Sequence, residues 1–393
     1  IVVRGTIPEA INGTFYRVSQ DPIVPPAEHA VSIDGHGVVS AFRVHEGQVD
    51  FKVKYIRTER YLTERKARKS LFGLYKNTWS DHPCVKGVVD STANTNIIYW
   101  AEQLLALRES ANPYSVHPDT LQTNGYDPFG KQVNSEAFTA HPKIDPFTNE
   151  LNGVVKSPYV TFIHDMVLTE NFIVLILWPF EASVDRMKAG GHHFAYDYDL
   201  PASFIVMPRR PEEANAGWKK GEYRVYETKN LDFVGFELDL SQPTGTKVPE
   251  PRVLLDIPNE FPRIDERYMS KKYEIVFSCV FYPGHSDTKK LLFSGPNAVS
   301  MLNTRTGEQK CYSPGENCYC QEPAFVPRSD DAPEGDGWVM FVVERRNLNL
   351  PMRVRPQIHG NWVDARELND QPLIDEPGEI KLSGKAINLK IDA

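Results

Sequence analysis

The stretch NTNIIYWAEQLLALRES, from Asn94 to Ser110, contains two short apolar runs separated by the polar corner Ala101-Glu102. Each run has the length of a β-strand, and a short polar corner between two such runs predicts a β-hairpin. The same pattern recurs with corners at Glu46-Gly47, at Thr169-Glu170-Asn171 and at Thr306-Gly307. We therefore expect antiparallel hairpins along much of the chain.

The strand signals recur through nearly the whole sequence, and 30 prolines and 25 glycines lie between them as turn residues. Convincing long helices are scarce. The basic run RTERYLTERKARKS (Arg57 to Ser70) predicts a solvated helix. Short antiparallel strands without βαβ alternation favour a large closed or radial all-β fold. A β-propeller fits because its blades leave only short, protected edges. No clean repeat is visible, so periodicity does not give the number of blades.

The bulk composition restricts the class of protein. The formal net charge of −8 argues against a nucleic-acid-binding protein. The longest apolar run, FIVLILWPF (Phe172 to Phe180), is far shorter than the roughly 18 residues of a membrane span. Three of the five cysteines cluster between Cys311 and Cys320, but no second pair lies nearby to complete a zinc site. We expect free thiols and a cytoplasmic protein.

Three of the 11 histidines have contexts that differ from the rest. His141 follows a small apolar run and precedes an Asp-Pro turn, His164 ends an apolar run, and His359 lies near the C-terminus in IHGNW. In a propeller the inner strands end around a central axis, so imidazoles from several strand ends could converge on one ion. Neutral imidazoles suit iron, copper and zinc, and the spacing does not choose among these metals.

Several motifs occur in the order found in a known family: GTFYRVSQDP, IDGHGVVSAFRV, FTAHPKIDPFTNEL, FIHDMVLTENFIVL, EPAFVPR and IHGNW. From about Gly5 to Trp362 the chain resembles the carotenoid cleavage oxygenases, and more closely their stilbene-cleaving branch. The resemblance implies a seven-bladed β-propeller, here a single domain over residues 1–393. A dome of loops and short helices would cap an axial Fe(II) held by four histidines.

The resemblance also assigns metal ligands by motif. His141, His164 and His359 match the first, second and fourth ligand histidines of the family. The third would lie between RVYETKN and EPRVLLDIP, where this sequence has no histidine. The junction Asn230-Leu231 reads as though a segment were missing, and similar gaps are suspected near 153–156 and 347–350. We expect the third ligand in the missing segment.

Further residues match the family's site. Glu109 and Glu322 correspond to glutamates that hydrogen-bond the metal-bound histidines. Tyr75 matches a tyrosine that contacts the phenol of the substrate, and Glu260 is a candidate for the resorcinol-like end. Arg108 stands where the stilbene-cleaving relatives have a lysine. Because arginine is always protonated, it can stabilise a phenolate but cannot act as a base.

The expected function is that of a non-heme Fe(II) dioxygenase, which cleaves the central C=C bond of resveratrol-like stilbenes with O₂ into two aromatic aldehydes. Cleavage of a carotenoid or apocarotenoid is an alternative, which would need a long apolar tunnel and no phenol-binding pair. A non-catalytic scaffold is another, if the third ligand is truly absent. A zinc hydrolase is disfavoured because no carboxylate base stands beside the histidines. The expected partners are a small stilbenoid and O₂, with no nucleic acid and no obligate protein partner.

Overall fold

A computed structural model describes most of the chain, namely residues 5–26, 33–109, 111–131, 133, 135, 137–152, 163–210, 218, 222–228, 234–282, 295–345 and 357–368. Its contacts divide the chain into two compact units. The first unit comprises Ile1–Ala140, Ala182–Ala195 and Val354–Ala393, and the second comprises His141–Glu181 and Tyr196–Arg353. The single domain over residues 1–393 stays a prediction.

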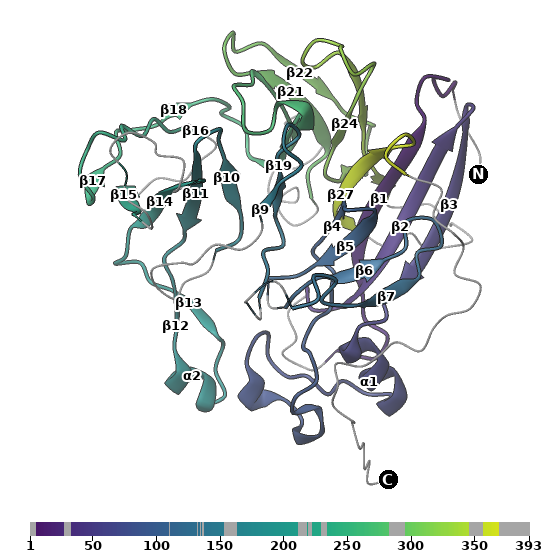
Figure 1. The fold of residues 1–393 in the computed structure, drawn as a ribbon, viewed down its shortest axis with the longest axis vertical. Helices are drawn as coiled ribbons and strands as arrows, with labels where there is room; N and C mark the ends of the chain where they lie inside the picture. The colour runs from purple at the N-terminus through teal and green to yellow at the C-terminus, as the bar shows by residue number, and fades with distance from the viewer. Residues whose placement is uncertain are drawn as a thin grey trace. The chain divides into compact units, whose positions relative to one another are not determined.

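The first unit contains two four-stranded antiparallel sheets (Figure 1). One has the order β27-β1-β2-β3, so the last described strand pairs with the first. The other has the sequential order β4-β5-β6-β7. The strand bounds are β1 Gly13–Asp21, β2 His36–His45, β3 Gln48–Tyr55, β4 Asn96–Trp100, β5 Gln103–Leu107, β6 Tyr114–Val116, β7 Thr123–Tyr126 and β27 Gln357–Asp364. Both sheets contribute side chains to one buried apolar cluster, which includes Tyr16, Val39, Ile97 and Leu104.

The corner between β4 and β5 shows why this sequence turns there. Ala101 has φ 50° and Glu102 has φ 62°. Two successive residues of positive φ match the right-handed twist of the flanking strands, which is the usual geometry of a two-residue hairpin. Glu46 and Gly47 have the same signs between β2 and β3. Both predicted hairpins are confirmed.

Helix α1 (Glu59–Ala67) confirms the predicted helix, but the expectation that it is solvated was wrong. Glu59, Arg60 and Glu64 are buried. Arg60 Nη2 lies 2.8 Å from Asp34 Oδ2, and Glu64 Oε2 lies 2.9 Å from His36 Nε2. Buried charges of this kind are stable only when they are paired. The helix is thus held by ion pairs rather than by an apolar face.

Short elements complete the first unit. They are η1 (Thr78–Ser80), η2 (Pro83–Val85) and α2 (Val184–Lys188). The strands β12 (Phe180–Ala182) and β13 (Phe194–Tyr196) flank α2 in the sequence, and each spans a sequence boundary between the two units. Asn77 caps η1, and its side-chain nitrogen donates to the carbonyls of Met187 (3.0 Å) and Gly191 (2.7 Å). These bonds join the η1 and α2 segments.

The second unit is also built from antiparallel strands (Figure 1). One sheet has the order β10-β11-β14-β15-β17, whose last pair is parallel, and another has the order β19-β20-β21-β22. Two-stranded pairs are β8-β9, β16-β18, β23-β26 and β24-β25. The bounds are β8 Lys143–Ile144, β9 Leu151–Asn152, β10 Met166–Leu168, β11 Phe172–Leu177, β14 Ala202–Pro208, β15 Arg224–Thr228, β16 Val234–Gly235, β17 Thr246–Lys247, β18 Arg252–Val253, β19 Asn259–Ile264, η3 Glu266–Tyr268, β20 Ile275–Val280, β21 Ala298–Asn303, β22 Gln309–Tyr312, β23 Cys318–Cys320, β24 Ala324–Pro327, β25 Gly337–Met340 and β26 Val343–Arg345.

The remaining sequence predictions have mixed outcomes. The hairpins at Thr169–Asn171 and Thr306-Gly307 are confirmed as β10-β11 and β21-β22. All five cysteines are free, as expected. In the part of the chain that the structure describes, no helix is long and apolar enough to cross a membrane. The suspected gaps near 153–156, 230–231 and 347–350 lie outside the described residues.

Candidate active site

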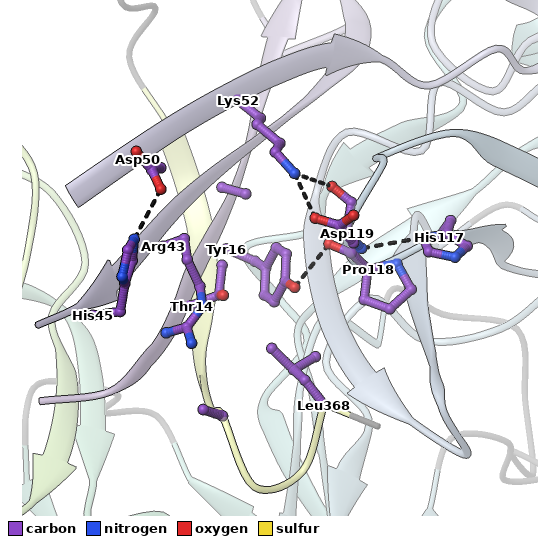
Figure 2. Close-up of a pocket in the computed structure, with 12 residues that line it drawn as sticks. Thr14, Tyr16, Arg43, His45, Asp50, Lys52, His117, Pro118, Asp119 and Leu368 are labelled. Carbon is purple, nitrogen blue, oxygen red and sulfur yellow. Dashed lines mark hydrogen bonds and ion pairs between the residues drawn. The ribbon is translucent and has the colours of Figure 1, made fainter. Parts of the chain in front are cut away.

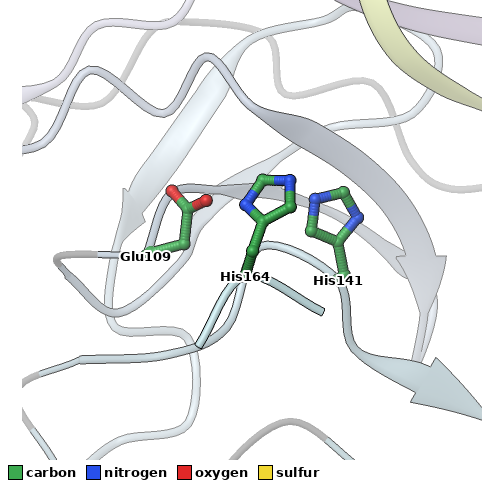
Figure 3. Close-up of side chains that lie close together, drawn as sticks. All are labelled: Glu109, His141 and His164. Carbon is green, nitrogen blue, oxygen red and sulfur yellow. The ribbon is translucent and has the colours of Figure 1, made fainter. Parts of the chain in front are cut away.

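Two of the predicted metal ligands lie together in the second unit. His141 directly precedes the β8 segment, and His164 directly precedes the β10 segment. Their ring centroids are 4.5 Å apart and the rings are inclined at 63°. Figure 3 shows the two imidazoles side by side, and one nitrogen of each lies within 4.8 Å of the other. Nitrogens at this separation can share one metal ion.

The Asp-Pro turn after His141 has a clear local cause. Asp145 Oδ1 accepts hydrogen bonds from the backbone N–H of Phe147 (2.8 Å) and of Thr148 (3.3 Å), which closes an Asx turn. The carboxylate also pairs with Arg209 at 2.5 Å, and the Arg209 side chain is only 1% exposed. The turn sends the chain back so that β9 pairs with β8. This fixes the backbone that carries His141.

A charged pair borders the two histidines. Lys143 Nζ lies 2.7 Å from Asp165 Oδ1, and Asp165 immediately follows His164. Burial favours a raised pKa for Asp165, but Lys143 and His141 outweigh it and hold the pKa below its usual range. Asp165 therefore stays ionised. Its position beside His164 could have been noticed in the sequence, but the partner Lys143 could not.

The donor set fits Fe(II) in its chemistry. Imidazole nitrogens suit first-row metals such as iron, copper and zinc, so His141 and His164 fit Fe(II). His359 lies in β27 of the first unit and is 9% exposed. Its role as a further ligand stays a prediction. The segment expected to carry the third ligand adjoins Asn230-Leu231 and lies outside the described residues.

The predicted phenol-binding residues gather in the first unit. The guanidinium carbon of Arg108, at the end of β5, lies 5.0 Å from the centroid of the Tyr75 ring. Burial and the charge of Glu109 raise the pKa of Tyr75 to about 12, although Arg108 opposes this shift. Tyr75 is therefore protonated at neutral pH and can donate its O–H. Glu109, also drawn in Figure 3, follows Arg108 directly.

Arg108 is fixed by two acceptors. Its Nη1 donates to Thr92 Oγ1 at 2.7 Å, and its Nη2 donates to Asp34 Oδ1 at 2.9 Å. The side chain is 2% exposed. A planar guanidinium held at two points presents its remaining donors in a fixed direction. Asp34 is a site residue that the sequence did not reveal, because it lies 74 positions away from Arg108.

The other two predicted site residues lie in the second unit. Glu322 is buried, and its Oε2 lies 3.2 Å from Arg263 Nη1. Arg263 also donates to Glu266 at 2.8 Å. Glu260 is an exposed residue of β19, three positions before Arg263 on the same strand. A β-bulge between Glu260 and Arg263 interrupts the pairing of β19 with β20.

A separate pocket of about 520 Å³ opens in the first unit (Figure 2). Its walls carry the ion pair of Lys52 with Asp119 and the pair of His45 with Asp50 at 2.9 Å. Tyr16 donates its hydroxyl to the carbonyl of Pro118 at 2.9 Å. None of the predicted site residues lines this pocket. We do not assign this pocket to the active site, because it contains none of the residues that the motifs point to and two of its charged pairs are internal to its walls.

The chain matches the sequence profile of the retinal pigment epithelial membrane protein family over residues 1–154, 152–231 and 212–364. The chain belongs to the carotenoid oxygenase family. This carotenoid oxygenase is 45% identical to resveratrol cleavage oxygenase 1 of Botryotinia fuckeliana, over 98% of the chain and 86% of that protein. It is 30% identical to lignostilbene-alpha,beta-dioxygenase isozyme III of Sphingomonas paucimobilis, over 93% and 94%.

The fold agrees with a solved member of the family. The crystal structure of Pseudomonas brassicacearum lignostilbene dioxygenase superposes with a TM-score of 0.81 and 29% identity, covering 92% of this chain and 94% of that one. The family assignment and the all-β propeller are confirmed. The alignment with the Botryotinia protein spans 481 positions, more than the 393 residues of the chain. That relative thus has residues where this carotenoid oxygenase has none, and the positions of the suspected gaps stay a prediction.

Proposed function

We propose that this carotenoid oxygenase is a non-heme Fe(II) dioxygenase that cleaves the central C=C bond of resveratrol-like stilbenes. One O₂ is consumed and two aromatic aldehydes form, with one oxygen atom in each. The observation that carries the proposal is the pairing of Tyr75 with Arg108 in the first unit. A polar pair of this kind suits a phenol and has no role on a hydrocarbon chain. The 45% identity to a resveratrol cleavage oxygenase supports the same choice.

The chain's residues would act on the phenol end of the substrate. Tyr75, protonated because its pKa is raised to about 12, donates a hydrogen bond to the phenol oxygen. Arg108, held by Asp34 and Thr92, faces the same oxygen and stabilises negative charge on it. Charge on the phenol oxygen pushes electron density onto the alkene. Glu260 remains the proposed contact for the resorcinol-like end.

The metal site completes the proposal. His141, His164 and His359, with a further ligand from the segment near Asn230-Leu231, would hold Fe(II). Glu109 and Glu322 would accept hydrogen bonds from the ligand imidazoles, which fixes the ring orientation and tautomer. Fe(II), when bound, supplies the binding and activation of O₂. We place these groups in one seven-bladed propeller domain, and the five free thiols support a cytoplasmic location.

The alternative is cleavage of a carotenoid or apocarotenoid. It is supported by the 33% identity to carotenoid cleavage oxygenase 1 of Neurospora crassa, over 94% of this chain. Such a substrate has no phenol for Tyr75 and Arg108 to bind, so these residues would be expected to pack without a functional partner.

The decisive experiment is anaerobic reconstitution with Fe(II), followed by O₂ and either resveratrol or an apocarotenal. We expect 4-hydroxybenzaldehyde and 3,5-dihydroxybenzaldehyde in equal amounts from resveratrol, and protein loaded with Zn²⁺ serves as the control. Aldehydes from the apocarotenal alone would favour the alternative. No product together with no bound iron would indicate a non-catalytic scaffold.

A further inference from the structure

Lys76, which follows Tyr75, is held in an unusual backbone conformation. Its φ is 57°, a left-handed value that non-glycine residues rarely adopt. The backbone is anchored on both sides. The carbonyl oxygen of Lys76 lies 2.8 Å from Nδ1 of His193, which must carry the hydrogen because a carbonyl can only accept. The next residue, Asn77, bonds to the carbonyls of Met187 and Gly191.

This anchoring places the Lys76 side chain among the phenol-binding residues. Its Nζ lies 5.3 Å from the centroid of the Tyr75 ring and 5.6 Å from that of the Phe194 ring. Both distances lie within the range of a cation–π contact. Tyr75 is in turn stacked on Arg108, so both cationic side chains contact the same tyrosine. The Lys76 amine thus contacts the ring of Tyr75, the residue proposed to hydrogen-bond the phenol of the substrate.

The charged groups that shift the pKa of Lys76 come from two segments. Arg108 lies at the end of β5 and Glu109 follows it, while Asp90 lies between η2 and β4. Asp90 is itself bound to Arg60 at 2.8 Å. Glu109 and Asp90 favour the ammonium form, whereas Arg108 and burial favour the neutral amine. Burial is the largest of these effects, and it lowers the pKa of Lys76 to about 8.

Ionising the phenol requires a group that can take its proton, and neither of the other two proposed phenol-binding residues can do so. Arg108 is permanently protonated. Tyr75 is itself an acid with a pKa of about 12. An amine with a pKa of about 8 is neutral in roughly a tenth of molecules at pH 7 and in most molecules above pH 8. Lys76 can therefore do what Arg108 cannot.

We propose that Lys76 contacts the phenolic hydroxyl of the substrate beside Tyr75 and Arg108 and accepts its proton. The inference rests on the proposed function and names the residue that ionises the phenol. In the step the phenol O–H bond breaks and an N–H bond forms on Nζ, giving a phenolate and an ammonium ion. The proton returns to the phenol oxygen when the hydroxylated aldehyde leaves. No electrons are gained or lost.

The test compares Lys76→Met and Lys76→Arg with the control Lys86→Met, which removes an exposed lysine of the same unit. The first readout is the pH profile of kcat/KM for resveratrol. Wild type and K86M should show a rise through pH about 8, because the neutral amine is the active form. Both Lys76 variants should lack this rise and lose about 10²-fold or more of kcat/KM at pH 8.

The second readout needs no metal. Metal-free protein is titrated with 4-hydroxybenzaldehyde, and the absorption band of the bound phenolate is followed against pH. Wild type should form the phenolate at lower pH than K76M does. K76R separates a cation that merely stabilises phenolate from an amine that accepts a proton, because it keeps the charge but should not restore the rise in kcat/KM.

The outcomes distinguish the two proposals. If wild type makes both aldehydes while the Lys76 variants keep its pH profile and its phenolate titration, the role of Lys76 is overturned and the proposed function stands. If the phenolate titration depends on Lys76 but no aldehyde forms, the phenol contact stands and stilbene cleavage is overturned. If wild type neither binds the phenol nor forms aldehydes, both are overturned.

Discussion

The carboxylate of Asp34 lies 2.9 Å from the guanidinium of Arg108, and it also accepts hydrogen bonds from Arg60 of helix α1. The side chains of all three residues are at most 5% exposed. One carboxylate is therefore paired with two buried guanidinium groups. Through Asp34, helix α1, which the sequence predicted to be solvated, is connected to Arg108, the residue proposed to face the substrate.

Replacing Asp34 with Asn keeps the shape of the side chain but removes its charge. Two buried guanidinium groups would then lose their principal counter-ion, and we expect the free energy of unfolding to fall by about 3–5 kcal/mol. Urea denaturation followed by circular dichroism measures the change. The control Asp50→Asn breaks the exposed His45–Asp50 pair and should cost no more than about 1 kcal/mol. Equal losses in the two variants would refute a special role for Asp34.

Glu64 makes the stability of α1 dependent on pH. Burial favours a raised pKa for Glu64, but hydrogen bonding to His36, the charge of Arg60 and the backbone N–H of Leu71 together hold it below the ordinary value. A carboxylate with a lowered pKa in the folded state contributes stability above its unfolded pKa, near 4.5, and this is lost as the pH falls through the folded value.

We expect Glu64→Gln to be less stable than wild type at pH 7 and to show a smaller further loss between pH 5 and pH 3. Urea midpoints measured across this range would test it. Glu316→Gln, in an exposed turn, should follow the wild-type curve. A Glu64→Gln curve parallel to wild type across the acid range would count against the linkage.

The sequence predicted hairpins well because their signals are local. At Ala101-Glu102 and Glu46-Gly47 the polar corner and its positive φ angles are properties of adjacent residues. The environment of α1 was not predictable in this way. Arg60 looks like a solvent-facing residue until Asp34 and Asp90, 26 and 30 positions away, are placed beside it.

In the candidate active site, too, local motifs were predictable from the sequence and long-range contacts were not. Motif order located His141 and His164, and the structure brings them together. Lys76 was overlooked because its lowered pKa arises from burial and from Arg108, neither of which a sequence window contains. The glutamate partners of the histidines remain predictions from the motifs. Their test requires a measurement of the metal.

Replacing His141 or His164 with Ala should abolish tight iron binding. Losing a group that hydrogen-bonds a metal ligand lowers metal affinity by roughly 10–100-fold. Each of these variants loses a ligand itself, so its affinity for iron should fall by more than that. Iron per chain, measured by plasma emission spectrometry after gel filtration, reports the loss. His45→Ala removes a partly exposed histidine of β2 and should retain the iron of wild type. Full iron content in either ligand variant would contradict the assignment.

Glu322 and Glu266 both pair with Arg263. Comparing their variants therefore shows whether Glu322 supports the metal site or serves only to pair Arg263. Arg263 lies 3.2 Å from the buried Glu322 and 2.8 Å from Glu266, whose side chain is 51% exposed. If Glu322 also orients a ligand imidazole, Glu322→Gln should lower the affinity for iron by about 10–100-fold, because a neutral amide is a weaker acceptor. Glu266→Gln weakens the hold on Arg263 as well but should leave iron binding unchanged. Competition with a chelator measures both, and equal iron affinities in the two variants would show that Glu322 serves only to pair Arg263.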